Sequence, residues 1–288
     1  MITASDNVWQ VAHGRSLKLD GDGLIMAIVN ATPDSFSDGG RYLAADLAIA
    51  HALDCVTKGA HIIDIGGEST RPGAAGVSEQ EEQDRVLPII ERLSGVTDAL
   101  ISVDTYRAST ARLAVEAGAH IVNDVFGLQK DAAMANVVAE TGAGVCIMHT
   151  GREREKLPDV IADQFAFLNT SLDIADKAGI SRSAIILDPG FGFAKDTDEN
   201  VLLMSRFDEL SRFGLPILAG TSRKRFIGAL TGRDGAEDRD IGTAATTAIL
   251  RIAGAIVFRV HNVEMTRDAL AVADAVLRQK KNKGDGRL

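Results

Sequence analysis

The chain has 288 residues, of which 45% are hydrophobic and 25% charged, and its formal net charge is −9. This composition suits a globular protein with one large α/β domain or two smaller ones. The acidic balance argues against non-specific nucleic-acid binding, and no apolar run reaches the roughly 18 residues of a membrane span. The two cysteines cannot build a disulfide framework, which favours a reducing, cytoplasmic setting.

The two ends of the chain differ in composition from the rest. Residues 1–22 carry several charges and no unbroken apolar core, so we predict an N-terminal extension rather than a signal peptide. Residues 279–288 are basic and contain glycine, which is typical of a flexible tail. A single domain is expected between them, over residues 23–278.

Within that domain, apolar runs alternate with segments of helical periodicity. Near-continuous apolar runs are typical of parallel strands that are buried on both faces. Ser78 and Asn262 precede two of the helical segments as capping residues. Eight such repeats in about 250 residues favour a (β/α)8 TIM barrel. The predicted strands are residues 24–29, 61–66, 100–104, 120–124, 145–148, 184–188, 216–220 and 255–260.

Polar side chains lie at or just after the ends of these predicted strands. A single polar residue there means little, but in barrel enzymes the carboxyl ends of the strands carry the active site. The recurrence in repeat after repeat therefore predicts a site at this face. The residues are Asn30, Asp64, Glu68, Asp104, Asn123, Asp124, His149, Asp188, Ser222, Lys224, Arg259 and His261.

Asp104, Asn123 and Asp188 could form one wall of that site. Carboxylates in a barrel mouth can be glycosidase acids, metal ligands or hydrogen-bond acceptors. The chain has few aromatic residues for a sugar cleft, and its histidines are scattered rather than clustered as metal ligands. The set better suits a planar heterocycle with ring N–H and amino groups, because each carboxylate can accept two donors side by side.

Basic residues gather near the same face. Thr221 and Ser222 lie where a helix is expected to begin, followed by three basic residues that include Lys224, and helix N-termini bind anions. Arg259 and His261 alternate on the last strand, so they point the same way. Together with Arg71 in a glycine-rich loop, these basic residues predict that the site binds an anionic ligand.

Common nucleotide and hydrolase motifs are missing from the sequence. The segment GFGFAK begins like a dinucleotide fingerprint, but Lys195 occupies the third glycine position. No GxxxxGK or GxSxG motif is present. Cys146 lies within a predicted strand and is expected to be a buried, inert thiol.

The motifs NATPDSFSDGG, DIGGESTRPGA, SVDT, NDV, LDPGFGF, SRK and RVH occur in the order seen in dihydropteroate synthases, and the chain resembles that family from about residue 24 to 275. The resemblance implies a transferase that joins 4-aminobenzoate to 6-hydroxymethyl-7,8-dihydropterin diphosphate, releasing diphosphate and giving 7,8-dihydropteroate for folate synthesis. It also implies Mg2+ as cofactor, competitive inhibition by sulfonamides, and a homodimer formed through helices late in the barrel.

The resemblance also assigns roles to residues. Catalysis falls to Asp104, Arg71, Lys224, Arg259 and His261. Pterin binding falls to Asp104, Asn123, Met148, Asp188, Phe193 and Lys224. The diphosphate would contact Asn30, Thr70, Arg71, Arg259 and His261, with Asn30 also meeting the magnesium. The 4-aminobenzoate would contact Phe36, Pro72, Phe193 and Ser222, with Phe36 acting as an apolar lid in a mobile first loop.

The chain departs from the family pattern in three places. Tyr106-Arg107 follow SVDT where Ser or Lys and Pro are frequent, the loop MHTGRERE is unusually charged, and Asn262 replaces a frequent Asp. None removes a residue assigned to chemistry. Two rivals remain open: the pterin-binding domain of methyltransferases, which does not need the TPDSFSDGG and SRK segments, and a non-catalytic paralogue, which would be expected to lose Arg71, Lys224 or His261 first.

Overall fold

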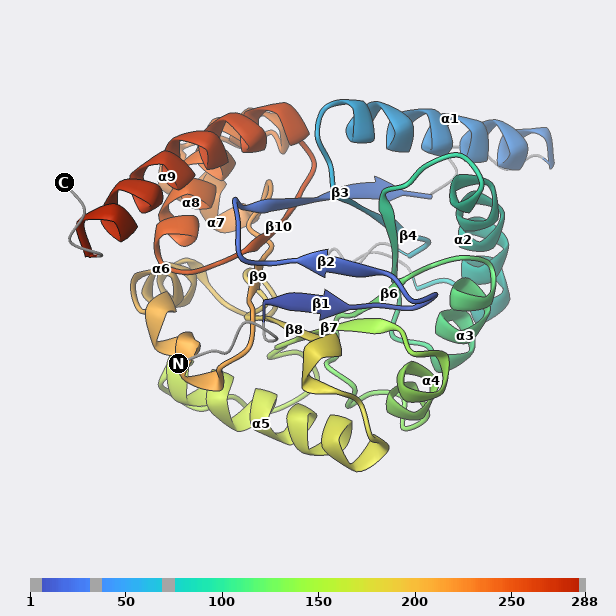
Figure 1. The fold of residues 1–288 in the computed structure, drawn as a ribbon, viewed down its shortest axis with the longest axis horizontal. Coiled ribbons are helices and arrows are strands. Elements are labelled where there is room, and N and C mark those ends of the chain that lie inside the picture. Colours follow the sequence, from blue (N-terminus) through green and yellow to red (C-terminus); the bar gives the residue numbers. More distant parts are fainter. Residues whose placement is uncertain (1–6, 32–37, 69–75, 285–288) are drawn as a thin grey trace.

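A computed structural model, which describes residues 7–31, 38–68 and 76–284, contains eight parallel strands arranged as a barrel with helices around it (Figure 1). The strand order is β8-β7-β6-β5-β4-β3-β10-β9. The barrel closes between β8 and β9, where Leu187 forms a parallel bridge with Ile217 and its N–H donates to the Pro216 carbonyl at 3.0 Å. The predicted (β/α)8 barrel is confirmed.

The barrel strands are β3 (Leu24–Asn30), β4 (Ile62–Gly66), β5 (Leu100–Asp104), β6 (Ile121–Asp124), β7 (Gly144–Met148), β8 (Ile185–Asp188), β9 (Leu218–Ala219) and β10 (Val257–Val260). The α-helices are α1 (Asp38–Thr57), α2 (Glu79–Ser94), α3 (Ala108–Glu116), α4 (Met134–Thr141), α5 (Val160–Ala178), α6 (Thr197–Ser205), α7 (Arg225–Thr231), α8 (Asp240–Ile252) and α9 (Val263–Gly284). Short 3-10 helices are η2 (Arg182–Ala184), η3 (Phe207–Phe213) and η4 (Glu237–Arg239). Each of the eight predicted strands overlaps one of the barrel strands.

The strands read as continuous apolar runs because both of their faces are buried. In β3, Ile25 and Val29 face outward and pack in the layer between the strands and the helices, whereas Met26 faces inward. We call the inward-facing apolar set near the strand starts the lower layer; it comprises Leu24, Met26, Ile62, Leu100, Ile121, Cys146, Ile186, Leu218 and Val257.

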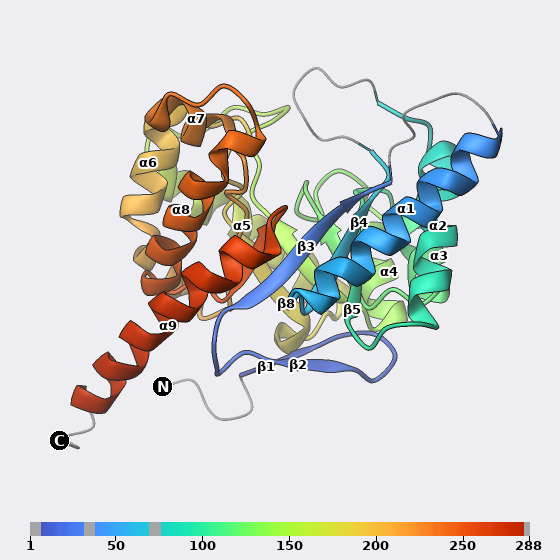
Figure 2. The same ribbon diagram turned by 90° about the horizontal axis from the view of Figure 1, so that it is seen from above.

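A hairpin covers the end of the barrel where the strands begin (Figure 2). It consists of β1 (Val8–Gln10) and β2 (Ser16–Lys18), paired antiparallel. Trp9 is fully buried against the lower layer, and its Nε1–H donates to the Ala184 carbonyl at 2.9 Å. A Cβ on Gly144 would lie 2.6 Å from Val11 Cγ1, so the hairpin sits directly on the start of β7. The hairpin therefore completes the core at this end of the barrel.

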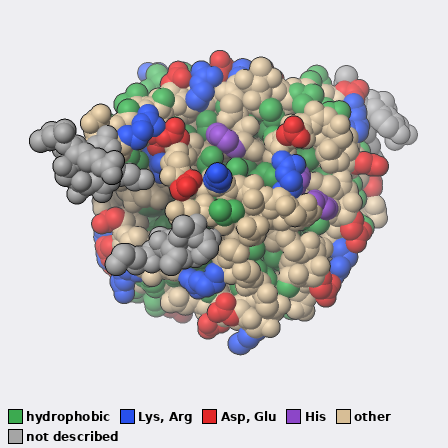
Figure 3. All heavy atoms as spheres, in the orientation of Figure 1, with side chains coloured by type: hydrophobic (Ala, Val, Ile, Leu, Met, Phe, Trp, Pro, Cys, Tyr) green, Lys and Arg blue, Asp and Glu red, His purple; other side chains and the backbone are tan. Residues whose placement is uncertain are grey.

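The outer surface on the hairpin side of the molecule mixes charges of both signs, with histidine side chains among them (Figure 3).

Two predicted capping residues are confirmed. The Glu81 N–H donates to Ser78 Oγ at 3.2 Å at the start of α2, and the Met265 N–H donates to Asn262 Oδ1 at 3.1 Å at the start of α9.

Helix α9 extends to Gly284, so the boundary expected at residue 279 falls inside a helix. Its basic residues continue the helical segment without a glycine or proline before position 284 to end it. Among the residues that the structure describes, no helix is long and apolar enough to cross a membrane.

Candidate active site

The carboxyl ends of the strands bring polar side chains together inside the barrel. Because side chains alternate along a strand, the residues two or four positions beyond the lower layer also face inward. In this upper layer the apolar residues give way to carboxylates, an amide, a hydroxyl and a guanidinium. The upper layer comprises Asp64, Ser102, Asp104, Asn123, Asp188 and Arg259, and the side chains of all but Arg259 belong to buried residues.

Arg259 links the carboxylates of the upper layer. Its Nε donates to Asp64 Oδ2 at 2.6 Å, and its Nη2 donates to Asp104 Oδ2 at 2.7 Å. The Asn123 amide also donates to Asp64 Oδ2, at 3.1 Å. Burial by itself would lower the pKa of Arg259, but the two carboxylates raise it above its ordinary value, so the guanidinium stays charged.

The carboxylates of the predicted wall lie in an environment that disfavours their charge. Burial raises the pKa of Asp104 to about 7, against the opposing effect of Arg259. Burial also raises the pKa of Asp188, whose Oδ1 accepts the Gly190 N–H at 2.7 Å. Donors from a bound heterocycle would relieve this cost, because a carboxylate that accepts hydrogen bonds is stabilised in its charged form.

Lys224 and an apolar cluster form the neighbouring part of the mouth. The Lys224 ammonium lies 4.2 Å from the centre of the Phe193 ring. Phe193 packs with Met148 and Val125, so the two residues predicted at the pterin rim do lie together. Burial, followed by the charge of Arg259, lowers the pKa of Lys224 to about 8.

The segment after β9 differs from the prediction of an anion site at a helix start. Helix α7 begins at Arg225 with Lys224 as its N-cap, so Ser222 lies ahead of the helix. The Ser222 hydroxyl instead meets His261, at 2.9 Å from Nδ1, and accepts the His261 N–H at 3.1 Å. Of the basic residues 223–225, Arg223 turns away to pair with Asp240 at 2.7 Å and Arg225 is exposed, whereas Lys224 lies over the Phe193 ring.

The residues predicted to contact the diphosphate and the 4-aminobenzoate are described only in part. Phe36, Thr70, Arg71 and Pro72 lie outside the described residues. Asn30 ends β3 with an exposed side chain, next to Gly66 in the sheet register. Within the described ranges, no group of three or more His, Cys, Asp or Glu side chains could hold a metal ion. Asn30 by itself offers one neutral oxygen, which fits a magnesium ion that a substrate diphosphate carries.

His149 was grouped with the strand-end polar residues, but it does not face the mouth. Its ring is fully buried, with Nε2 2.9 Å from Asp163 Oδ2 on α5. Asp124 likewise faces its own loop, where it accepts the Phe126 and Leu128 N–H groups at 2.8 and 2.7 Å. Both residues directly follow an inward-facing position, so alternation turns them outward.

Asp64 and Ser102 were not assigned to the wall, although they form its floor. They are register partners in β4 and β5, and both are fully buried. Asp64 Oδ1 and Ser102 Oγ have no hydrogen-bond partner among the described residues. The signal was present in the sequence, since each is a polar residue inside an otherwise apolar strand.

Two of the departures from the family pattern lie at the mouth. The Tyr106 hydroxyl donates to Glu68 at 3.2 Å, and Arg107 pairs with Glu68 and with the buried Glu82, each at 2.8 Å. In the charged loop after β7, the Arg152 guanidinium lies 4.4 Å from the centre of the Phe193 ring. The departures therefore rearrange the rim and leave the upper layer intact.

This arrangement can bind a flat, polar heterocycle that carries an anionic group. Carboxylates and an amide provide acceptors and donors within the barrel, while Lys224, Arg259 and His261 bring donors to the same side. Such a site defines a barrel enzyme for a pterin-like ring, and the family model described as "Pterin binding enzyme" matches residues 26–261.

Comparison with known proteins places the chain in a narrower group within the pterin-binding enzymes. The dihydropteroate synthase of Bacillus subtilis (strain 168) is 47% identical over 264 residues, covering 91% of this chain and 90% of that protein. The structure of Xanthomonas albilineans dihydropteroate synthase with 4-aminobenzoic acid has a TM-score of 0.87 at 44% identity, covering 94% of this chain and 98% of that one. Yersinia pestis dihydropteroate synthase in a sulfonamide drug complex has a TM-score of 0.85 at 40% identity, covering 93% and 98%. This chain belongs to the dihydropteroate synthase family of transferases.

Proposed function

We propose that this chain joins 4-aminobenzoate to 6-hydroxymethyl-7,8-dihydropterin diphosphate, giving 7,8-dihydropteroate and diphosphate, with Mg2+ as cofactor. The observation that carries the proposal is the convergence of Asp104, Asn123 and Asp188 inside the barrel, beside Lys224. The 47% identity to a dihydropteroate synthase over most of both chains supports it.

The pterin ring would lie against the upper layer. Asp104 and Asp188 would accept its ring N–H and amino donors, and Asn123 would offer both an acceptor and a donor. Lys224 would donate to the ring oxygen, while Met148 and Phe193 would cover the rim. Leaving these buried donors or acceptors unmatched costs about 1–3 kcal/mol each, which would exclude a ring with a different pattern.

The diphosphate would extend toward the mouth, where Asn30, Thr70, Arg71, Arg259 and His261 are assigned to it. Mg2+ bound there through the diphosphate and Asn30 would supply charge neutralisation for the leaving group. Arg259 also holds Asp64 and Asp104, so it would connect the pterin end of the site to the diphosphate end.

The 4-aminobenzoate carboxylate would meet Ser222, which is fixed by its contact with His261. Phe36, Pro72 and Phe193 would enclose the ring. A sulfonamide drug is bound in the Yersinia pestis relative, and we expect sulfonamides to compete with 4-aminobenzoate here as well. Inhibition by sulfamethoxazole that does not weaken as 4-aminobenzoate is raised would contradict this assignment.

For the reaction we propose that diphosphate leaves before, or well ahead of, attack by the amine. The bond between the methylene carbon and the diphosphate oxygen breaks, and its electron pair leaves with the diphosphate. The dihydropterin ring spreads the resulting positive charge, which the Asp104 carboxylate stabilises. The neutral amine then forms the C–N bond and loses a proton, a step that needs positioning more than a strong base.

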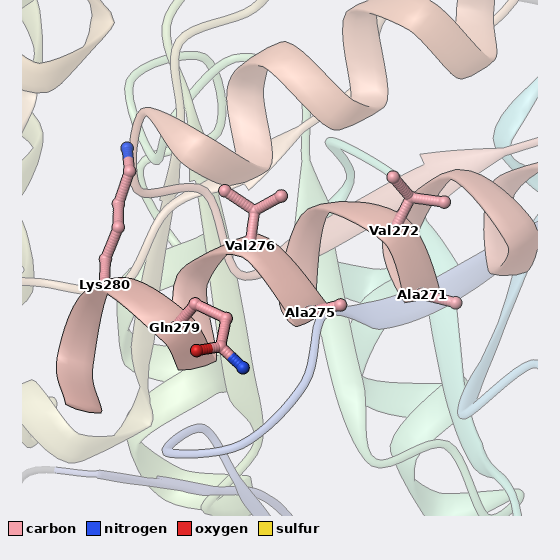
Figure 4. A pocket seen from close by; sticks show the side chains of 6 residues that line it. All are labelled: Ala271, Val272, Ala275, Val276, Gln279 and Lys280. Carbon is pink, nitrogen blue, oxygen red and sulfur yellow. The ribbon is translucent and has the colours of Figure 1, made fainter. Parts of the chain in front are cut away.

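We also propose that the chain forms a homodimer through α8 and α9, in the cytoplasm. Both helices expose large aliphatic side chains, with Ile241 74%, Ile249 52% and Val272 67% exposed. Val272 and Val276 help to line a shallow pocket on α9 (Figure 4). An exposed apolar surface of this kind is typical of a protein interface.

Light scattering tests the dimer. It should find a monomer for Val272→Glu and an unchanged dimer for the control Leu113→Glu on α3.

The proposed reaction is tested by diphosphate release from the dihydropterin substrate with Mg2+, with and without 4-aminobenzoate. Release that requires 4-aminobenzoate would establish the synthase, and release without it would support early departure while leaving the second substrate site in doubt. No release from a protein that still binds the pterin would favour a non-catalytic paralogue. Lys224→Met should abolish release, whereas the matched variant of its exposed neighbour, Arg225→Met, should not.

A further inference from the structure

The turn that follows β8, residues 189–195, connects the wall of the site to the protein core. Gly190, Gly192 and Ala194 all have left-handed backbones, with φ of 65°, 76° and 52°. Because these left-handed residues alternate with Phe191 and Phe193, the Phe191 side chain packs in the layer between strands and helices, and the Phe193 side chain lies at the mouth. For Ala194 this conformation is unfavourable, so side chains around the turn must hold it in place.

Lys195 holds the turn from the inside. The residue is only 9% exposed, and its Nζ donates to the Gly190 carbonyl and to His149 Nδ1, each at 2.9 Å. Neither contact is part of the proposed chemistry. A lysine in such a buried place is uncommon and is retained only with partners for its hydrogen bonds.

Gly190 connects Lys195 to the pterin wall through the two peptide groups on either side of its Cα. Its N–H donates to Asp188 Oδ1 at 2.7 Å, while the carbonyl of the same residue accepts from Lys195. Only glycine fits at this position, because a Cβ on Gly190 would lie 1.9 Å from the His149 carbonyl oxygen. The Asp188 carboxylate is thus oriented by an amide whose own residue Lys195 fixes.

The far end of the chain of contacts is also fixed. His149 Nε2 lies 2.9 Å from Asp163 Oδ2, and Arg154 donates to both oxygens of Asp163, at 2.9 and 2.6 Å. Burial lowers the pKa of His149 to about 4, so the ring is neutral. Because Lys195 donates to Nδ1, the ring proton is assigned to Nε2, which donates to Asp163; Arg154 Nη2 lies 2.9 Å from the same Nε2 and donates to Asp163. Burial lowers the pKa of the Lys195 amino group to about 7, and both its charged and its neutral form can donate to His149 Nδ1.

We infer that Lys195 is a positioning residue for pterin binding: through Gly190 it sets the orientation of the Asp188 carboxylate, and His149 with Asp163 sets the position of Lys195. The inference rests on the proposed function, because it assumes that Asp188 accepts hydrogen bonds from a pterin ring. It assigns a role to a lysine that does not touch the substrate.

The test compares two lysines that donate to the same turn. Lys195→Met removes the inner amino group, and Gly190 O keeps the Phe193 N–H at 3.1 Å as a partner. The matched control is Lys156→Met, because Lys156 donates to the Ala194 carbonyl at 2.7 Å from the outer side, with no contact to Gly190. Lys195→Gln, which retains one donor group, is the intermediate variant.

Binding of 6-hydroxymethyl-7,8-dihydropterin is measured by titration, the KM of each substrate by steady-state kinetics, and folding by thermal unfolding. We expect Lys195→Met to weaken pterin binding about tenfold, the loss of roughly one well-placed hydrogen bond, and Lys195→Gln to lie between it and wild type. The KM for 4-aminobenzoate should change less than twofold, and Lys156→Met should match wild type.

The outcomes separate the two proposals. Wild-type protein that does not bind the dihydropterin contradicts the proposed function itself. Wild-type binding that Lys195→Met and Lys195→Gln both retain within twofold overturns the positioning role. Equal increases in both KM values, with a lowered unfolding temperature, would mean a general structural role and would also overturn it. If Lys195→Met does not fold, Lys195→Gln alone decides between these results.

Discussion

The lower and upper layers of the barrel are built from the same strands, and they differ in what their inward-facing side chains do. In the lower layer, Met26, Ile62 and Leu100 pack with Trp9 from the hairpin and leave no polar side chain without a partner among the described residues. Further along the same strands, buried carboxylates stand close together, and two polar atoms, Asp64 Oδ1 and Ser102 Oγ, have no hydrogen-bond partner among the described residues. The comparison indicates that the lower layer provides stability, which the upper layer gives up for ligand binding.

The largest expected effect on stability comes from breaking the lower layer. Trp9→Ala should lower the free energy of unfolding by about 3–5 kcal/mol, since it removes a fully buried indole and its hydrogen bond to Ala184. Denaturant titration measures this, with the exposed Leu230→Ala as the control. Dihydropterin affinity of the folded variant should be unchanged. A loss below 1 kcal/mol would show that the hairpin is not part of the core.

Changing the upper layer should affect turnover rather than stability at neutral pH. Asp104→Asn should lower the turnover number by about 10²–10³-fold, the usual effect of removing one charge-stabilising group. Steady-state turnover is the measurement, and Asp198→Asn, an exposed carboxylate on α6, is the control. Unchanged turnover for Asp104→Asn, together with its loss in Arg259→Ala, would rule out the proposed role of the carboxylate.

Asp104→Asn should also change stability in a pH-dependent way. The folded-state pKa of Asp104, about 7, lies above its ordinary value, so its contribution is complete below about pH 4 and is lost as pH rises through 7. Asparagine does not ionise. The variant should therefore unfold at a higher temperature than wild type at pH 8, and the difference should vanish at low pH.

The lower end of the barrel should respond to pH in the other direction. His120 accepts the Ile101 N–H at 3.1 Å through Nδ1, and burial, with Arg15 and His13, lowers its pKa to about 4. Its contribution is present above about pH 6.5 and lost as pH falls toward 4, by about 1–3 kcal/mol. His120→Asn keeps an acceptor that does not titrate, so thermal unfolding between these pH values should depend less on pH. An unchanged acid limb would contradict this.

The smallest effect concerns ligand affinity. If the pterin ring requires the Asp104 carboxylate, dihydropterin affinity should fall about tenfold from pH 8 to pH 6, because the pKa of that group is about 7. Titration of Asp104→Asn should give no such slope. Lys224, with a pKa of about 8, could add its own dependence, so the slope should be checked in Lys224→Met.

Residues in the candidate site could be predicted to different degrees. The strand ends marked Asp104, Asn123 and Asp188, because polar residues that end apolar runs are visible in the sequence. Asp64 was harder to assign, since nothing in the run IIDIG states which other strands its side chain will face. The pairing of Arg259 with Asp64 and Asp104 joins residues more than 150 positions apart and depends on barrel closure.

By itself, the sequence determined the eight repeats, the face that carries the polar side chains and the family, because hydrophobic periodicity and local motifs are properties of neighbouring residues. Only the tertiary structure decided that the hairpin covers the lower end of the barrel, that His149 turns away from the mouth, and that Lys195 reaches back to Gly190. Each of these features depends on where a side chain points within the protein interior, where segments far apart in the sequence meet. Packing and burial set that direction, and no local pattern encodes them.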